Sequence, residues 1–369
     1  MDSRPGSPTQ RLRRILAAVV IALLAAAPAA SAQAPAPAQY HGVQLHPLWN
    51  GVSLRQSDRQ LGLVKGSGAD VVRVDVAWAS IEQNGRNQIN WGYVRRTDAF
   101  LRRARARGLK VILTLAGTPC WAARAPDSVR QGCGGAWWDR GVPIYPPRRA
   151  HDYAHAAVWV ARRWGRELLA LEVWNEPNHP AFFRSRDPVR SYSSMLRAAY
   201  LPIKRAAPGL VVLGGSLALS DGDFLAGLYD RGHILGSYDA ISYHPYTDGR
   251  DPSEPAATAG WRTSFVDGTR WLRDTIASRG DPNPQLWITE VGATTCTGLK
   301  VCVDERKQAR QIQDFIDIAA GWPYVRAVVI YSLRDNAGSA GDPAGRFGLL
   351  RRDLSPKPAW AAFQAALAH

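Results

Sequence analysis

LLALEVWNEP, residues 168–177, is an apolar run that stops in an amide, a carboxylate and a proline. Residues 168–173 have the length and composition of a buried strand. Pro177 prevents the chain from continuing as a regular helix, so Asn175 and Glu176 are expected at the end of the strand with their polar side chains toward solvent. Glu176 is therefore a candidate functional residue.

A second apolar run stops in the same way further along the chain. Residues 285–289, QLWIT, are followed by Glu290. Two carboxylates that flank one bond are what glycoside hydrolysis requires, because one acts as an acid and the other as a nucleophile or base. Two carboxylates in one site do not both ionise easily, so one is expected to keep its proton and serve as the acid.

Short apolar runs alternate with amphipathic stretches from residue 40 onward. Eight runs are candidate strands: 42–45, 71–76, 110–115, 168–173, 210–213, 240–243, 285–289 and 325–331. Helical stretches include 91–107, 149–166, 190–206, 264–278 and 305–320, and 358–368 follows the last strand. This repeat predicts an α/β fold, a (β/α)8 TIM barrel. A doubly wound open sheet is the alternative, but no G-x-G-x-x-G motif follows the first strand.

Residues 1–32 are expected to be a secretory signal peptide. Three arginines within residues 11–14 precede an apolar segment at 15–27, and Ala-Ser-Ala at 30–32 is a small-residue cleavage site. An uncleaved membrane anchor is the alternative, although this segment is short for a bilayer and no later run is long enough. The expected location is therefore secreted, with no integral membrane span after removal of the signal.

The mature chain is expected to begin near Gln33, with an Ala/Pro-rich lead-in at 33–39 and a single catalytic domain at 40–369. The whole chain has a formal net charge of +15; without the signal peptide, 42 basic and 30 acidic side chains leave +12. The arginines are scattered along helical stretches and are not clustered, which argues against a nucleic-acid partner. An affinity for acidic polysaccharide or the cell envelope stays open.

The chain contains four cysteines: Cys120, Cys133, Cys296 and Cys302. An even number in an exported protein suggests two disulfides. Of the three possible pairings we favour 120–133 with 296–302, because each pair falls within one predicted loop. Zinc is the alternative, but no C-x-x-C spacing and no neighbouring histidine supports it.

Further polar and aromatic residues follow the predicted strands, where the functional groups of a barrel gather. Strands four and seven are three apart in a ring of eight, so their glutamates are expected to face each other across the mouth. The other strand-end residues are His46, Arg73, Asp75, Thr118, Pro119, His244, Tyr246, Arg334 and Asp335. The long connection at 116–149 carries Trp121, Trp137 and Trp138, which either stack on sugar rings or pack the loop onto the barrel.

These stretches resemble the signatures of clan A retaining glycoside hydrolases. The resemblance rests mainly on WNEP at 174–177 and on Thr289-Glu290. Further matches are RVDVAW at 73–78, Gly117-Thr118-Pro119 with Trp121, Ile203-Lys204 with Pro208, and YHPY at 243–246. Over about residues 40–365 the chain is most similar to glycoside hydrolase family 39, with family 5 close behind.

The resemblance implies a role for each matching residue. Glu176 would be the general acid/base and Glu290 the nucleophile of a reaction with net retention. Asn175 would bind the sugar 2-hydroxyl, and Arg73 would lie under the nucleophile and keep it ionised. His244 and Tyr246 would orient the nucleophile and line the subsite at the cleavage point, with His46 and Trp121 as further substrate-binding candidates.

One position departs from the pattern of the clan. Many members end the eighth strand with a tryptophan that forms the floor of the subsite, whereas residues 328–332 contain none. Tyr331 is the candidate for that role, so the sugar preference of the subsite is open.

The resulting hypothesis is a secreted retaining β-glycosidase that hydrolyses O-glycosidic bonds in a poly- or oligosaccharide, as a monomer and without a cofactor or metal. Endo-action is favoured because no second domain closes the site into a pocket. His151 and His155 are four residues apart, a spacing that can bind zinc, but the H-E-x-x-H glutamate is missing. The alternative function is a non-catalytic carbohydrate-binding barrel, either a pseudoenzyme or a surface-retained adhesin.

Overall fold

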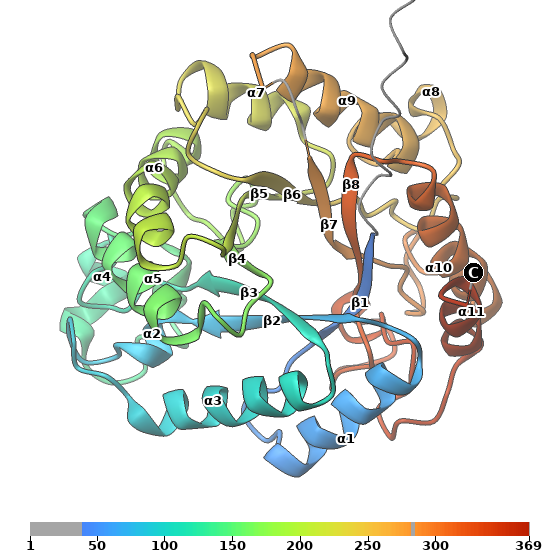
Figure 1. Cartoon of the computed structure of the whole chain (residues 1–369), viewed down its shortest axis with the longest axis horizontal. Coiled ribbons are helices and arrows are strands. Elements are labelled where there is room, and N and C mark those ends of the chain that lie inside the picture. The colour runs from blue at the N-terminus through green and yellow to red at the C-terminus, as the bar shows by residue number, and fades with distance from the viewer. Residues whose placement is uncertain (1–38, 282–284, 369) are drawn as a thin grey trace, which may run out of the picture. The chain divides into compact units, whose positions relative to one another are not determined.

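Eight parallel strands form a closed barrel in the computed structural model, which describes residues 39–281 and 285–368 (Figure 1). Each strand pairs with the next, and β8 pairs with β1. The strands are β1 (Tyr40–Leu45), β2 (Val71–Ala77), β3 (Lys110–Ala116), β4 (Ala170–Val173), β5 (Val211–Ala218), β6 (Ala240–His244), β7 (Leu286–Val291) and β8 (Val325–Ile330). The predicted (β/α)8 barrel is confirmed.

Helices surround the barrel and connect its strands (Figure 1). They are α1 (Leu54–Gly66), α2 (Trp78–Ile81), α3 (Trp91–Ala106), α4 (Asp127–Arg130), α5 (Ala150–Trp164), α6 (Pro188–Ala206), α7 (Gly222–Asp230), α8 (Ala256–Ala259), α9 (Phe265–Ala277), α10 (Glu305–Ala320) and α11 (Pro358–Ala366). The predicted signal peptide lies outside the described residues, as does the lead-in except for Gln39. Within the described part of the chain, no helix has the length and apolar character needed to cross a membrane.

Polar caps fix where the main helices begin. Ser53 and Gln56 form a capping box at α1, in which each side chain bonds the backbone of the other residue. The side chains of Asn90, Asp187 and Asp304 accept a backbone N–H at the start of α3, α6 and α10. Each cap satisfies a donor that the helix leaves unpaired, so α3 and α10 begin at the predicted residues.

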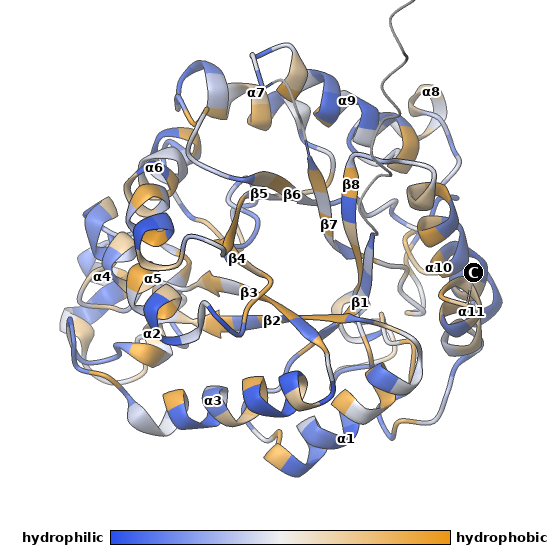
Figure 2. Cartoon of the chain, in the orientation of Figure 1, coloured by the Kyte–Doolittle hydropathy of each residue, from blue (hydrophilic) through white to orange (hydrophobic). Residues whose placement is uncertain are grey.

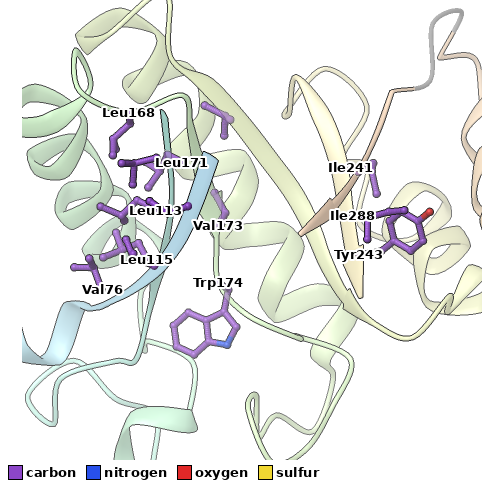
Figure 3. Close-up of a cluster of buried hydrophobic side chains, with 14 of the residues drawn as sticks. Val76, Leu113, Leu115, Leu168, Leu171, Val173, Trp174, Ile241, Tyr243 and Ile288 are labelled. Carbon is purple, nitrogen blue, oxygen red and sulfur yellow. The ribbon is translucent and has the colours of Figure 1, made fainter. Parts of the chain in front are cut away.

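The strands contribute apolar side chains to two separate clusters. The larger cluster lies between strands and helices and includes Leu113, Leu115 and Val173 (Figure 3). The surrounding helices accordingly carry both hydrophobic and hydrophilic residues (Figure 2). A smaller cluster contains residues of seven strands, mostly near their starts: Val71, Ile112, Ala170, Leu213, Ala240, Trp287, Ala327 and Val329.

Polar side chains replace apolar ones further along several strands. Gln44 is paired in register with Arg73, and Thr114 with Glu172, and all four are fully buried. Thr289 on β7 is also fully buried, and its hydroxyl donates to Glu172. A connected polar layer therefore lies beneath the carboxyl ends of the strands.

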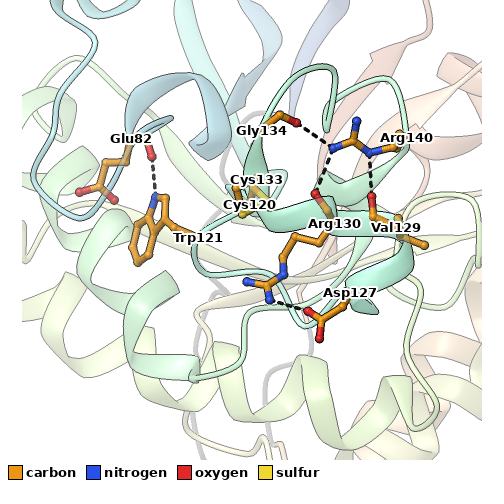
Figure 4. Close-up of a disulfide and its surroundings, with 9 residues drawn as sticks. All are labelled: Glu82, Cys120, Trp121, Asp127, Val129, Arg130, Cys133, Gly134 and Arg140. Carbon is orange, nitrogen blue, oxygen red and sulfur yellow. Dashed lines mark hydrogen bonds and ion pairs between the residues drawn. A yellow bond between two sulfur atoms is a disulfide. The ribbon is translucent and has the colours of Figure 1, made fainter.

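Two disulfides staple the loops as the sequence analysis favoured. Cys120 pairs with Cys133, and Cys296 pairs with Cys302. The first closes the long loop between β3 and α5 (Figure 4). In that loop the Arg140 guanidinium donates to the carbonyls of Val129, Arg130 and Gly134, at 2.8, 3.0 and 3.0 Å. The loop is thus held by covalent and polar links rather than by regular secondary structure.

Candidate active site

Glu176 and Glu290 meet at the mouth of the barrel. Glu176 follows β4 and Glu290 lies near the carboxyl end of β7, and each residue is 8% exposed. One oxygen of each carboxylate and one ring nitrogen of His244 all lie within 4.8 Å of one another. The expectation that the two glutamates face each other is therefore realised in the structure.

The backbone after β4 turns sharply to present Glu176. Trp174 and Glu176 have φ of 69° and 46°, in the left-handed region that side chains other than glycine rarely adopt. The Glu176 N–H donates to the Ser216 carbonyl at 2.8 Å, which ties the turn to β5. The buried Trp174 anchors it further, since its indole N–H donates to the Phe182 carbonyl. Such backbone strain persists where the surroundings over-determine it, as they do here.

Arg73 lies beneath the two glutamates and connects most of the polar layer. Its guanidinium donates to Glu290 Oε1 at 2.5 Å, to Glu172 Oε2 at 2.8 Å and to Asn175 Oδ1 at 2.8 Å. Its contact with Asp75, the partner considered as an alternative from sequence, is longer at 3.5 Å. Burial alone would lower the pKa of Arg73, but Glu172 and Glu290 outweigh it and raise the pKa, so Arg73 stays charged.

Tyr246 and His244 engage the two glutamates separately. The Tyr246 hydroxyl donates to Glu290 Oε2 at 2.8 Å, and burial followed by the Glu290 charge raises the pKa of Tyr246 well above its ordinary value. His244 Nδ1 is 2.8 Å from Glu176 Oε1 and 3.8 Å from Glu290 Oε2. Sequence reasoning assigned His244 to the nucleophile, whereas its closer contact is with Glu176.

Tyr331, His46 and Trp121 occupy different places. Tyr331 lines a cavity of about 410 Å³ together with Glu176, Tyr246 and Glu290. His46 lies beside that cavity, with its ring in edge contact with Tyr331 at 5.6 Å. Trp121 does not line it: its indole N–H donates to the Glu82 carbonyl at 2.7 Å (Figure 4), so it packs the loop onto the barrel.

A metal ion is the competing interpretation of the cluster at the mouth. Glu176, His244 and Glu290 form the one group of described residues spaced to share an ion. Both Glu290 oxygens are already engaged, one by Arg73 and one by the Tyr246 hydroxyl. The Arg73 guanidinium at bonding distance from Glu290 Oε1 disfavours a second cation there, which argues against a metal ion in this cluster.

Glu172 is the most consequential site residue that sequence reasoning passed over. It interrupts the apolar run at 168–173 and accepts hydrogen bonds from Arg73, Thr114 and Thr289. A lone charge inside an apolar run was the available signal. Burial alone would raise the pKa of Glu172, but Arg73 outweighs it and holds the pKa below its ordinary value. Glu172 therefore fixes Arg73, which in turn holds Glu290 and Asn175.

Replacement of Glu172 by glutamine is expected to lower the free energy of unfolding by about 3–5 kcal/mol, because Arg73 is left buried without its main counter-charge. Chemical denaturation at neutral pH measures the loss. Glu254→Gln is the matched control: Glu254 pairs with Arg250 on the surface, and that change is expected to cost less than about 1 kcal/mol. Equal small effects of both variants would contradict the importance of the buried pair.

His244 is expected to make stability depend on pH. Burial alone would lower its pKa, but the charges of Glu290 and Glu176 outweigh it and raise the pKa above 6.5. The stabilisation is therefore fully present below pH 6.5 and is lost as pH rises through the raised pKa. Denaturant unfolding of wild type and His244→Asn is measured across about pH 5–9. The difference between their free energies of unfolding should shrink as pH rises.

His41 supplies a contrast of opposite sign. Burial lowers the pKa of His41, so its neutral form is favoured and the wild type loses stability as pH falls through 6.5. The difference between wild type and His41→Asn should then change mainly on the acid side. If the difference in free energy of unfolding between wild type and His244→Asn does not change with pH, the carboxylate contacts of His244 do not stabilise its charged ring.

The comparisons with known proteins agree with this geometry. The family model "Cellulase (glycosyl hydrolase family 5)" matches residues 31–324. No curated protein sequence matches the chain.

Solved structures with similar folds are glycoside hydrolases. A family 39 enzyme from Bacteroides cellulosilyticus WH2 has a TM-score of 0.68 at 19% identity, over 89% of this chain and 64% of that one. A family 5 subfamily 18 enzyme from Streptomyces cattleya, in complex with Manβ1-4GlcNAc, has 0.66 at 22% identity, over 90% and 80%. A β-glucosidase from Pyrococcus furiosus has 0.61 at 14% identity, over 90% and 95%.

At these identities the structural likenesses show the fold alone, and this chain spans less than two thirds of the Bacteroides enzyme. The resemblance seen in the sequence placed family 39 first and family 5 close behind. The family model that matches most of the chain is that of family 5, and the similar structures include members of both families, as the resemblance predicted. The chain belongs to glycosyl hydrolase family 5 and is a glycoside hydrolase.

Proposed function

We propose that the chain is a retaining β-glycosidase in which Glu176 is the general acid/base and Glu290 is the nucleophile. The observation that carries the proposal is the spacing of the two glutamates, whose nearest oxygens lie within 4.8 Å. Retaining enzymes keep their carboxyl groups about 5–5.5 Å apart, whereas inverting enzymes leave room for a water at about 6.5–9.5 Å.

The first step forms a covalent glycosyl-enzyme. Glu290 attacks the anomeric carbon while the bond to the leaving oxygen breaks, and Glu176 gives its proton to that oxygen. Arg73 and Tyr246 each hold one oxygen of Glu290, which aims the carboxylate at the anomeric carbon. The Asn175 amide, oriented by Arg73 through its oxygen, binds the sugar 2-hydroxyl.

The second step releases the sugar. Glu176, now a carboxylate, takes a proton from water, and the water oxygen attacks the anomeric carbon and displaces Glu290. His244 stays hydrogen-bonded to Glu176 and holds its carboxylate in position. Two inversions at one carbon give net retention.

The substrate is a poly- or oligosaccharide with β-linkages, cleaved internally by a secreted enzyme that needs no metal. The solved neighbours include a β-glucosidase from Pyrococcus furiosus and a β-xylosidase from Caulobacter crescentus, which supports the β-linkage. Two disulfides support export, since such bonds persist in oxidising compartments. Tyr331 takes the position at the end of β8 that a tryptophan holds in many clan members.

Product stereochemistry tests this proposal. The purified protein is incubated with a panel of β-linked polysaccharides and aryl glycosides, and proton NMR follows the first anomeric signals. A β-anomer that appears before mutarotation supports retention, whereas an α-anomer that appears first contradicts it. If no reducing ends form from any glycan although the protein binds one, the chain is the non-catalytic carbohydrate-binding barrel.

A further inference from the structure

A second cavity, of about 690 Å³, opens beside the catalytic one. Its walls come from the loops after β1, β2 and β3, and they include Trp49, Trp137 and Trp138. Trp49 and Trp138 are 46% and 45% exposed, although large aromatic side chains are usually buried. Nothing in the reaction proposed for the glutamates uses this cavity.

A row of aromatic rings leads from the catalytic cavity to the second one. Tyr331 lies 5.5 Å from Phe347 on one side and 5.6 Å from His46 on the other, measured between ring centroids. His46 in turn stacks on Trp49 at 3.9 Å, with the planes only 17° apart. These contacts place the second cavity next to the catalytic one, since Tyr331 lines the first and Trp49 lines the second.

Polar groups along this row are positioned for a ligand. Both ring nitrogens of His46 are buried, and neither has a hydrogen-bond partner. Its Nδ1 lies 3.6 Å from Asp75 Oδ2, and the Asp75 side chain is 38% exposed toward the second cavity. An aromatic face next to a hydrogen-bonding carboxylate suits a sugar ring, which has apolar faces and a rim of hydroxyls.

The second cavity is acidic although the protein is basic. The whole chain carries +15, yet none of the described residues that line either cavity is lysine or arginine. Asp75 and Asp139 are the carboxylates that line the second cavity. A chain of uronic acids would therefore meet like charge, whereas neutral or amino-sugar rings would not.

The tryptophan wall belongs to a loop that is held by a disulfide and by hydrogen bonds. Trp137 is buried and its ring contacts that of Trp138 at 5.6 Å. Both follow Cys133 in the long loop between β3 and α5, which the Cys120–Cys133 disulfide and Arg140 hold (Figure 4). A preformed wall binds with a smaller ordering cost than a mobile loop.

We infer that this second cavity binds further sugar rings of the substrate, with Trp49 and Trp138 as stacking platforms, and that it selects long neutral or amino-sugar chains over uronate chains. This inference rests on the proposed glycosidase function for its turnover readout. It also predicts binding, which can be measured without turnover.

The test compares long and short substrates. Wild type, Trp49→Ala, Trp138→Ala and the double variant are assayed on cello-, xylo-, manno- and chito-oligosaccharides of two to six rings and on the matching aryl glycosides. Loss of the platforms should lower kcat/KM on six-ring chains at least about tenfold. On aryl glycosides, kcat/KM should stay within about twofold of the wild-type value. Trp91→Ala is the matched control, because Trp91 is 49% exposed on α3 and lines neither cavity.

Calorimetric binding of the same six-ring chains separates the two possible failures. If wild type binds them with the tryptophans required but cleaves none, the glycosidase proposal fails and the inference stands. If wild type cleaves them, and the ratio of kcat/KM on long substrates to kcat/KM on short ones is the same in the tryptophan variants as in wild type, the inference is wrong. Binding of a six-ring oligouronate as tight as that of the neutral chains would overturn the charge selection.

Discussion

Replacement of Glu290 by glutamine is expected to lower kcat/KM by about 10⁴–10⁶-fold, the range seen when a catalytic nucleophile is removed. The amide has the shape of the carboxylate but cannot form the glycosyl-enzyme. Arg73 and Tyr246, which each donate to one Glu290 oxygen, would still orient the side chain. Initial rates on the best substrate, measured with freshly purified protein, provide the readout.

A smaller side chain at position 290 tests whether Glu290 itself is the nucleophile. In Glu290→Gly the space of the carboxylate is open, and added azide is expected to attack the anomeric carbon directly and give a glycosyl azide of inverted configuration. Glu254→Gln, on the surface, serves as the matched control and should keep wild-type rates. Wild-type activity of Glu290→Gln would overturn the assignment.

The barrel was predictable because most of its strands are short, largely apolar runs that are followed by polar residues. β2, β3 and β6 begin at the predicted residues and extend one residue further than predicted. β5 was predicted to end at residue 213 but continues to Ala218. Gly214 and Gly215 disguised it, because glycine weakens a strand pattern.

That disguised segment also positions the site. Gly215 has φ +94°, and the register with β6 shifts between Gly215 and Leu217, which marks a bulge. The bulged residue Ser216 accepts the Glu176 N–H through its carbonyl. A bulge depends on which residue of the neighbouring strand it faces, and that pairing is not readable from one strand alone.

The site residues also fall into two groups, those that were predicted from the sequence and those that were not. Glu176, Glu290, Arg73, Asn175, His244 and Tyr246 were found from strand ends and from the family resemblance, and the structure brings them together. Their supporting residues, Gln44, Thr114, Glu172 and Thr289, lie inside strands. Their role depends on contacts across the barrel interior, so a single strand gives little sign of it. The packing role of Trp121 likewise depends on the position of Glu82, which is 39 residues away.

Replacement of Glu176 by glutamine should have an effect that depends on the leaving group. Natural glycans need a proton on the departing oxygen, so their kcat/KM is expected to fall about 10²–10⁴-fold. An aryl glycoside with a dinitrophenolate leaving group needs no proton, so formation of the glycosyl-enzyme should stay near the wild-type rate. Stopped-flow release of dinitrophenol should then show a burst followed by slow turnover, because the second step has lost its base.

The burst separates Glu176 from a residue that merely shapes the site. His244→Asn removes the hydrogen bond to Glu176 Oε1 but leaves the acid itself. Its loss of kcat/KM should therefore be similar on glycans and on dinitrophenyl glycosides, and smaller than the loss of Glu176→Gln on glycans.

Added azide should restore turnover of Glu176→Ala and give a glycosyl azide of retained configuration, opposite to the product from the Glu290 variant. Equal loss on good and poor leaving groups in Glu176→Gln would mean that Glu176 is not the proton donor. The opposite stereochemistry of the two azide products would assign the two carboxylates independently of each other, because each product records which face of the sugar its missing glutamate had occupied.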